Sequence, residues 1–118
     1  MYHILPESKD NVIGIRVEEE MRTNDYETLL PFIESMIKKY GTIRVLLDLS
    51  DLKGIEFRGI LKIVPYTFKF NSKVEKNAII TNQKWIHVWA KLLAPFFKTK
   101  VNCFSTRKAE QAWVWVKK

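Results

Sequence analysis

The stretch Ile43-Arg44-Val45-Leu46-Leu47-Asp48-Leu49 decides the fold. It is a nearly continuous apolar run rich in branched side chains, which is typical of a strand buried on both faces of a parallel sheet. A strand of this kind has helices over both faces, because parallel neighbours are joined by crossover segments. The run therefore predicts an α/β fold in which residues 43–49 form a central strand.

The residues before this strand predict a hairpin and a helix. Residues 2–5 and 12–18 are expected to form two antiparallel strands around a polar turn at residues 8–11. Asn24 with Glu27 three residues later resembles a capping box, and apolar side chains then recur at helical spacing until Gly41. Pro31 falls inside this helix and should bend it or weaken one turn.

The residues after the central strand predict further β-α units. We expect a loop at 50–55, a second helix from about Glu56, a third helix at 85–94, and strands at 76–81 and 100–104. The tail from Thr106 has apolar side chains on one helical face, although its Trp-Val-Trp-Val run would also suit a strand, and we predict a helix. The whole chain, 1–118, is thus expected to be one α/β domain: an N-terminal antiparallel hairpin, then β-α units with a mostly parallel sheet and right-handed crossovers.

Charge is distributed unevenly along the 118 residues. Residues 1–57 carry 7 Lys and Arg against 11 Asp and Glu, whereas residues 58–118 carry 13 against 2, so the net charges of the halves are −4 and +11. The second half also holds 10 of the 15 aromatic residues. A basic and aromatic half of this kind is expected to bind nucleic acid, an anionic membrane surface or an acidic ligand, and composition alone does not distinguish these partners.

The compartment expected from the sequence is the cytoplasm, with possible peripheral membrane association. A single cysteine, Cys103, excludes an intrachain disulfide and a Cys-rich metal site. The N-terminus lacks the basic flank and apolar core of a secretory signal. A spanning helix needs about 20 apolar residues, and the best candidate, residues 85–97, is interrupted by His87, Lys91 and Pro95.

The expected second and third helices each combine a wide apolar face with a basic stripe. Apolar side chains of residues 84–98 cover roughly 180° of the helix surface, against about 100° for an ordinary surface helix, while His87 lies with the lysines. This pattern is typical of a helix at a membrane interface, and packing on the sheet and a neighbouring helix is the alternative. The basic residues expected to meet phosphate-bearing headgroups are Arg58, Lys62, Lys84, Lys91 and Lys98.

An apolar pocket between these two helices is a further hypothesis. Pro65 should kink or split the second helix and loosen its packing, and sites for apolar ligands are concave and lined by large apolar side chains. An ordinary filled core is the alternative. The residues expected to line or gate the pocket are Phe57, Leu61, Val64, Phe68, Trp85, Trp89 and Leu93.

The sequence contains no catalytic constellation, metal site or cofactor motif, so we expect a protein that is not an enzyme. Cys103 in an apolar strand is expected to be a small buried hydrophobe. Asp48, Asp51 and Glu56 lie near the end of the central strand, where α/β folds often bind ligands, yet capping and solvation are their expected roles. Nucleic acid is disfavoured, because the aromatic residues fall at core periodicities.

Several short strings occur in a distinctive order: Asp25-Tyr26 with Leu30-Pro31, Ala78-Ile79-Ile80-Thr81 leading to Trp85-Ile86, and Phe104 followed by Glu110, Ala112 and Trp113. Together they resemble the SpoIIAA-like family, whose fold is shared by STAS domains and by the lipid-binding CRAL-TRIO domain. The order of the strings covers nearly the whole chain. The resemblance implies a β-α sandwich without catalysis, with an apolar-ligand cavity and membrane association through mobile helices.

The string from Leu47 to Leu52 is similar to the strand and loop of anti-sigma-factor antagonists. Glu56-Phe57-Arg58-Gly59 stands where those proteins carry an Asp-Ser-Ser-Gly turn with a regulatory phosphoserine, and this second resemblance implies an alternative function. Phe57 and Arg58 fill both serine positions, so that switch cannot operate there. Ser50, beside two acids, is expected to be structural. The alternative is a regulatory protein that binds a protein partner without the phosphoserine switch.

Overall fold

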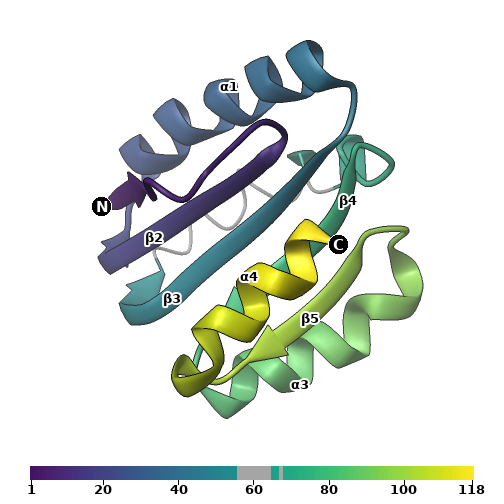
Figure 1. Cartoon of the computed structure of the whole chain (residues 1–118). Coiled ribbons are helices and arrows are strands. Elements are labelled where there is room, and N and C mark those ends of the chain that lie inside the picture. The colour runs from purple at the N-terminus through teal and green to yellow at the C-terminus, as the bar shows by residue number, and fades with distance from the viewer. Residues whose placement is uncertain (56–64, 67) are drawn as a thin grey trace.

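The computed structural model describes residues 1–55, 65–66 and 68–118. Within them the strands are β1 (Tyr2–Ile4), β2 (Val12–Met21), β3 (Ile43–Ile55), β4 (Val74–Ile80) and β5 (Lys100–Phe104). The helices that lie wholly within these residues are α1 (Thr23–Tyr40), α3 (Lys84–Leu93) and α4 (Ala109–Lys117), with 3₁₀ turns η1 (Ala94–Phe96) and η2 (Thr106–Lys108). The described strands form one sheet of order β1-β2-β3-β4-β5, in which β1 and β2 are antiparallel and the other neighbours are parallel (Figure 1). The predicted α/β class and N-terminal hairpin are confirmed.

β3 is the central strand, because it pairs in parallel with β2 on one side and with β4 on the other. Its successive side chains point to opposite faces of the sheet. Val45 packs in the cluster that α1 covers, and Leu46 packs in the cluster that α4 covers. Figure 1 shows α4 crossing in front of the sheet and α3 behind β5. The strand is therefore buried on both faces, as its sequence predicts.

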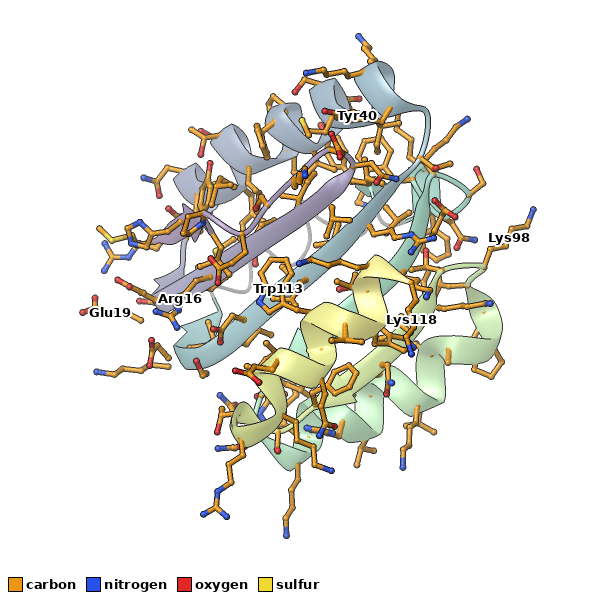
Figure 2. The ribbon with its side chains drawn as sticks, viewed as in Figure 1. Arg16, Glu19, Tyr40, Lys98, Trp113 and Lys118 are labelled. Carbon is orange, nitrogen blue, oxygen red and sulfur yellow. The ribbon has the colours of Figure 1, made fainter. Side chains whose placement is uncertain are left out.

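The side chain of Trp113, which extends from α4, reaches the backbone of β2 at Gly14. A Cβ atom on Gly14 would lie 2.5 Å from Cη2 of Trp113, 2.8 Å from its Cζ2 and 3.2 Å from the Cβ of Leu5. Trp113 extends from α4 over the sheet (Figure 2). The indole ring thus occupies the space in which a side chain on this strand would stand.

The prediction of a loop at 50–55 is wrong, because β3 continues to Ile55. β2 also runs beyond its predicted end, to Met21, and these additional residues of β2 pair with the additional residues of β3. The register shifts between Arg16 and Glu18 and again between Glu19 and Glu20. Irregularities of this kind interrupt the hydrogen bonding between two strands locally, after which the pairing resumes. The acidic run in β2 was not predicted as strand, because acidic residues are uncommon in strands.

The predicted capping box of Asn24 and Glu27 is also wrong, because α1 begins at Thr23 after Arg22. The carboxylate of Asp25 accepts a hydrogen bond of 2.9 Å from the backbone N–H of Arg22. Asp25 therefore caps the first turn of the helix, which is the role that the sequence assigned to Glu27. The helix continues through Pro31 to Tyr40.

The C-terminal half follows the predicted order. The third predicted helix and the tail helix are present as α3 and α4, and the two expected strands as β4 and β5. The second predicted helix, from about Glu56, falls mostly outside the described residues. Its described part, residues 65–66 and 68–69, is helical.

Candidate functional site

An apolar cavity of about 400 Å³ lies between the sheet and the helices on its α1 face. The strands and α1 contribute Ile15, Leu29, Leu30, Ile33, Val45, Leu47, Val74, Asn77, Ile79 and Val101. The segment before β4 contributes Tyr66 and Phe70, and α3 with the residues after it contributes Trp85, Ile86, Trp89, Ala90, Leu93, Ala94, Phe97 and Thr99. None of these lining residues is charged. The volume falls in the range of about 300–1,000 Å³ that is usual for small-molecule sites.

The cavity contains part of the pocket expected from the sequence. Trp85, Trp89 and Leu93 line it. Phe68 is not among the described lining residues, but its ring lies 5.5 Å from the ring of Phe97, which does line the cavity. The remaining expected pocket residues, Phe57, Leu61 and Val64, lie outside the described residues.

Sequence reasoning missed the contributions of the sheet and of α1. Alternating apolar residues in a strand, and apolar residues at helical spacing, are the patterns of any core. They do not reveal whether the facing side chains meet or leave a space between them. No sequence signal marks Asn77, because the two residues before it in the strand, Glu75 and Lys76, are charged.

Helix α3 is attached to the sheet at its N-terminal end by hydrogen bonds. The hydroxyl of Thr81 accepts from the backbone N–H of Gln83 at 3.1 Å, and the Gln83 side-chain amide donates to the carbonyl of Leu52 at 3.1 Å. The indole N–H of Trp85 donates to Oε1 of Gln83 at 2.6 Å. His87, expected among the solvated cations, instead lies with Nε2 2.8 Å from the carbonyl oxygen of Thr81. These contacts fix one end of the cavity wall that α3 supplies.

Beyond this attachment α3 exposes an unusual amount of apolar surface, since none of its residues is buried. Large exposed apolar patches on soluble proteins mark sites of interaction with a ligand, a membrane or another protein. We define the α3 apolar surface as the exposed side chains of Trp85, Val88, Trp89, Leu92, Leu93 and Phe96. The alternative, in which the sheet and a neighbouring helix cover the apolar face, does not describe these six exposed side chains.

Exposed lysines border the α3 apolar surface. Lys84 and Lys91 lie one turn before and after Val88, and Lys98 follows η1. None of the three forms an ion pair with any residue that the structure describes. The other two cations expected to meet headgroups, Arg58 and Lys62, lie outside the described ranges. Apolar and cationic groups therefore share one exposed side of α3.

The acidic residues near the end of the central strand have structural contacts. Oδ2 of Asp48 accepts from Nη2 and Nε of Arg16 at 3.2 and 3.3 Å, and its Oδ1 accepts from the backbone N–H of Ser50 at 3.0 Å and from the Ser50 hydroxyl. Asp48 is buried. Asp51 is an exposed residue within β3, and Glu56 lies outside the described residues. Figure 2 shows Arg16 on the side of the molecule opposite Lys98.

Replacing Asp48 with Asn is expected to lower the free energy of unfolding by about 1–2 kcal/mol. The variant removes the negative charge that Arg16 contacts and places an amide where two acceptor oxygens were. Urea unfolding followed by circular dichroism measures the change. The matched control Asp51→Asn, an exposed position on the same strand, should stay within about 0.5 kcal/mol of the wild type, and equal losses at both positions would contradict the structural role of Asp48.

The described residues contain no group of three or more His, Cys, Asp or Glu side chains that could hold a metal ion. Within the same ranges, no helix is both long and apolar enough to cross a membrane. Burial raises the pKa of the half-buried Cys103 thiol, and the charge of Lys91 opposes this effect. Because the thiolate is the nucleophilic form, Cys103 is a weak nucleophile at neutral pH.

Solved structures with the same fold include three that align with almost the whole chain. An uncharacterized protein of the DUF3478 family from Shewanella loihica PV-4, which has a SpoIIAA-like fold, has a TM-score of 0.80 and 19% identity and covers 98% of this chain and 92% of its own. The anti-sigma factor antagonist SpoIIAA in its unphosphorylated form has a TM-score of 0.68 and 8% identity, with coverage of 97% and 98%. An anti-sigma factor antagonist from Mycobacterium paratuberculosis has a TM-score of 0.57 and 18% identity, with coverage of 100% and 96%.

Comparison with curated protein sequences finds no match. The identities to the solved structures are too low to transfer a function, and these structures show the fold alone. The model of the SpoIIAA-like family matches residues 12–117, which include every described element after β1. This chain belongs to the SpoIIAA-like family.

Proposed function

We propose that this protein is a non-enzymatic binding module that holds an apolar or lipid-like molecule in the cavity and associates peripherally with anionic membranes through α3. One observation carries the proposal. Trp85, Trp89 and Leu93 line the cavity and also belong to the α3 apolar surface. The wall of the cavity is therefore also the exposed surface, and a ligand that passes this wall would enter or leave at the membrane.

Charge complementarity supports an anionic membrane as the surface that α3 meets. Trp and Leu side chains beside lysines are typical of helices that lie in the headgroup region, with their apolar side chains inserted and their cations near phosphate. Each Lys near such a surface contributes about 1 kcal/mol. Lys84, Lys91 and Lys98 together would supply enough attraction for reversible association.

The test is cosedimentation with vesicles of phosphatidylglycerol or of phosphatidylcholine, at low and high salt. We expect binding to the anionic vesicles that weakens as salt rises, because salt screens the exposed charges. The double variant Lys84→Gln/Lys91→Gln should bind these vesicles about thirtyfold more weakly, since it loses two contributions of about 1 kcal/mol each.

The matched control is Lys108→Gln/Lys117→Gln, which changes the net charge equally but lies in η2 and α4. It should bind like the wild type. Equal weakening in both double variants would show that net charge alone attracts the protein, and binding that ignores lipid charge and salt would contradict the electrostatic part of the proposal.

A second candidate function is recognition of a protein partner. It is favoured by the fold shared with two anti-sigma factor antagonists, and the α3 apolar surface would suit a protein as well as a lipid. Phe57 and Arg58 replace the two serines of the Asp-Ser-Ser-Gly turn to which this stretch is similar, so such a partner would be bound without a phosphoserine switch. A protein that copurifies with the wild type but not with Phe57→Asp, while vesicle binding is retained, would favour this candidate.

A further inference from the structure

Asn77 is a polar residue in an otherwise apolar row across the sheet. Its partners in the ladder are Val45 on β3 and Val101 on β5, and Val45 pairs in turn with Ile13 on β2. Residues aligned in this way on parallel strands face the same side of the sheet. Asn77, Val45 and Val101 all line the cavity. The row therefore presents one carboxamide to an apolar space.

The carboxamide of Asn77 is incompletely satisfied. Its Oδ1 is buried and has no hydrogen-bond partner among the residues that the structure describes. Three other lining side chains can donate: the hydroxyl of Thr99 donates to the carbonyl of Val74 at 2.7 Å, the indole N–H of Trp85 donates to Gln83, and the hydroxyl of Tyr66 is not bonded to Asn77. A buried polar atom without a partner is unfavourable, and most such atoms in folded proteins are paired.

We propose that Asn77 is the polar anchor of the cavity and that the ligand is an uncharged, long-chain molecule bearing a hydroxyl group. The proposal rests on the proposed function, since it requires a ligand in the cavity. A hydroxyl both donates and accepts, so it pairs with either end of the carboxamide, whose terminal torsion is broad and roughly two-fold. A charged headgroup does not fit this position, because no described lining residue carries a balancing charge and burying an unpaired ion is costly.

The test compares 1-decanol with 1-chlorodecane, which has a chain of the same length but no hydroxyl. Each competes with N-phenyl-1-naphthylamine, an uncharged apolar fluorophore, for the cavity of the wild type, of Asn77→Leu and of Asn77→Val. The quantity of interest is the ratio of the two dissociation constants within each protein, because this ratio cancels differences in the general affinity of each variant. We expect the preference for the alcohol to fall about tenfold in both variants, while 1-chlorodecane still binds.

Asn102→Leu is the matched control, because Asn102 is exposed on β5 and pairs with Ala78, which packs against α4 on the other face. Its preference ratio should equal that of the wild type. Thermal unfolding without ligand gives an independent readout: Asn77→Leu should raise the melting temperature by a few degrees, because it removes an unpaired polar group.

The outcomes separate this proposal from the proposed function. If the fluorophore and both chain compounds enter the wild type but the preference ratio is the same in the Asn77 variants, the anchor is wrong and the binding module stands. If Asn77→Leu lowers the melting temperature, Asn77 has a structural role and the anchor is again wrong. If nothing binds in the wild-type cavity, both proposals fail.

Discussion

Replacing Val88 with Asp is expected to weaken binding to phosphatidylglycerol vesicles by at least about thirtyfold. Val88 is 55% exposed in the α3 apolar surface, one turn from Lys84 and from Lys91. Loss of the inserted valine side chain removes about 1.5 kcal/mol of binding free energy, and the new negative charge near an anionic surface opposes binding by about 1 kcal/mol. The sum corresponds to a factor of roughly thirty to one hundred in the dissociation constant, measured by titration with vesicles in the cosedimentation assay.

Val114→Asp is the matched control for this variant. Val114 is also 55% exposed, but it lies on α4, which covers the opposite face of the sheet. The two variants introduce the same charge at equal exposure, so only their place on the molecule differs. Vesicle binding by Val114→Asp should fall by less than about threefold, as expected for one distant charge in salt. Similar weakening in both variants would show that α3 is not the surface that meets the membrane.

The second large effect is expected at Gly14. Gly14→Val should lower the free energy of unfolding by about 3 kcal/mol, because the new side chain would overlap the ring of Trp113. A Cβ atom alone would already lie 2.5 Å from Cη2 of that ring. Valine favours extended backbone, so strand propensity would act in the opposite direction and cannot explain a loss of stability. Urea unfolding measures the change.

A double-mutant cycle tests the cause. Trp113→Leu shortens the side chain that reaches Gly14 and is itself expected to be destabilising. In the Trp113→Leu background, Gly14→Val should lower the free energy of unfolding by about 1 kcal/mol or less, because the overlapping ring atoms are gone. If Gly14→Val lowers the free energy of unfolding equally in the wild-type and the Trp113→Leu backgrounds, the contact of the Trp113 ring with Gly14 is not what requires glycine.

Patterns within one segment predicted most of the fold. The apolar run of residues 43–49 gave a central strand because burial on both faces demands apolar side chains at every position. Helical spacing gave α1, α3 and α4, and the resemblance of short strings gave the family. The second half of β3 was missed, because its pairing with the acidic end of β2 depends on register shifts between two segments and leaves no period in either sequence.

For the candidate site, the sequence determined the composition of α3, in which large apolar side chains stand beside lysines. Only the tertiary structure decided that Trp85 and Trp89 are exposed and line a cavity, and that the Asn77 carboxamide faces that cavity without a partner for its oxygen among the described residues. The physical reason is that periodicity fixes the face of an element on which a side chain lies. Whether that face meets another element, a space or solvent depends on where the distant segments of the chain pack.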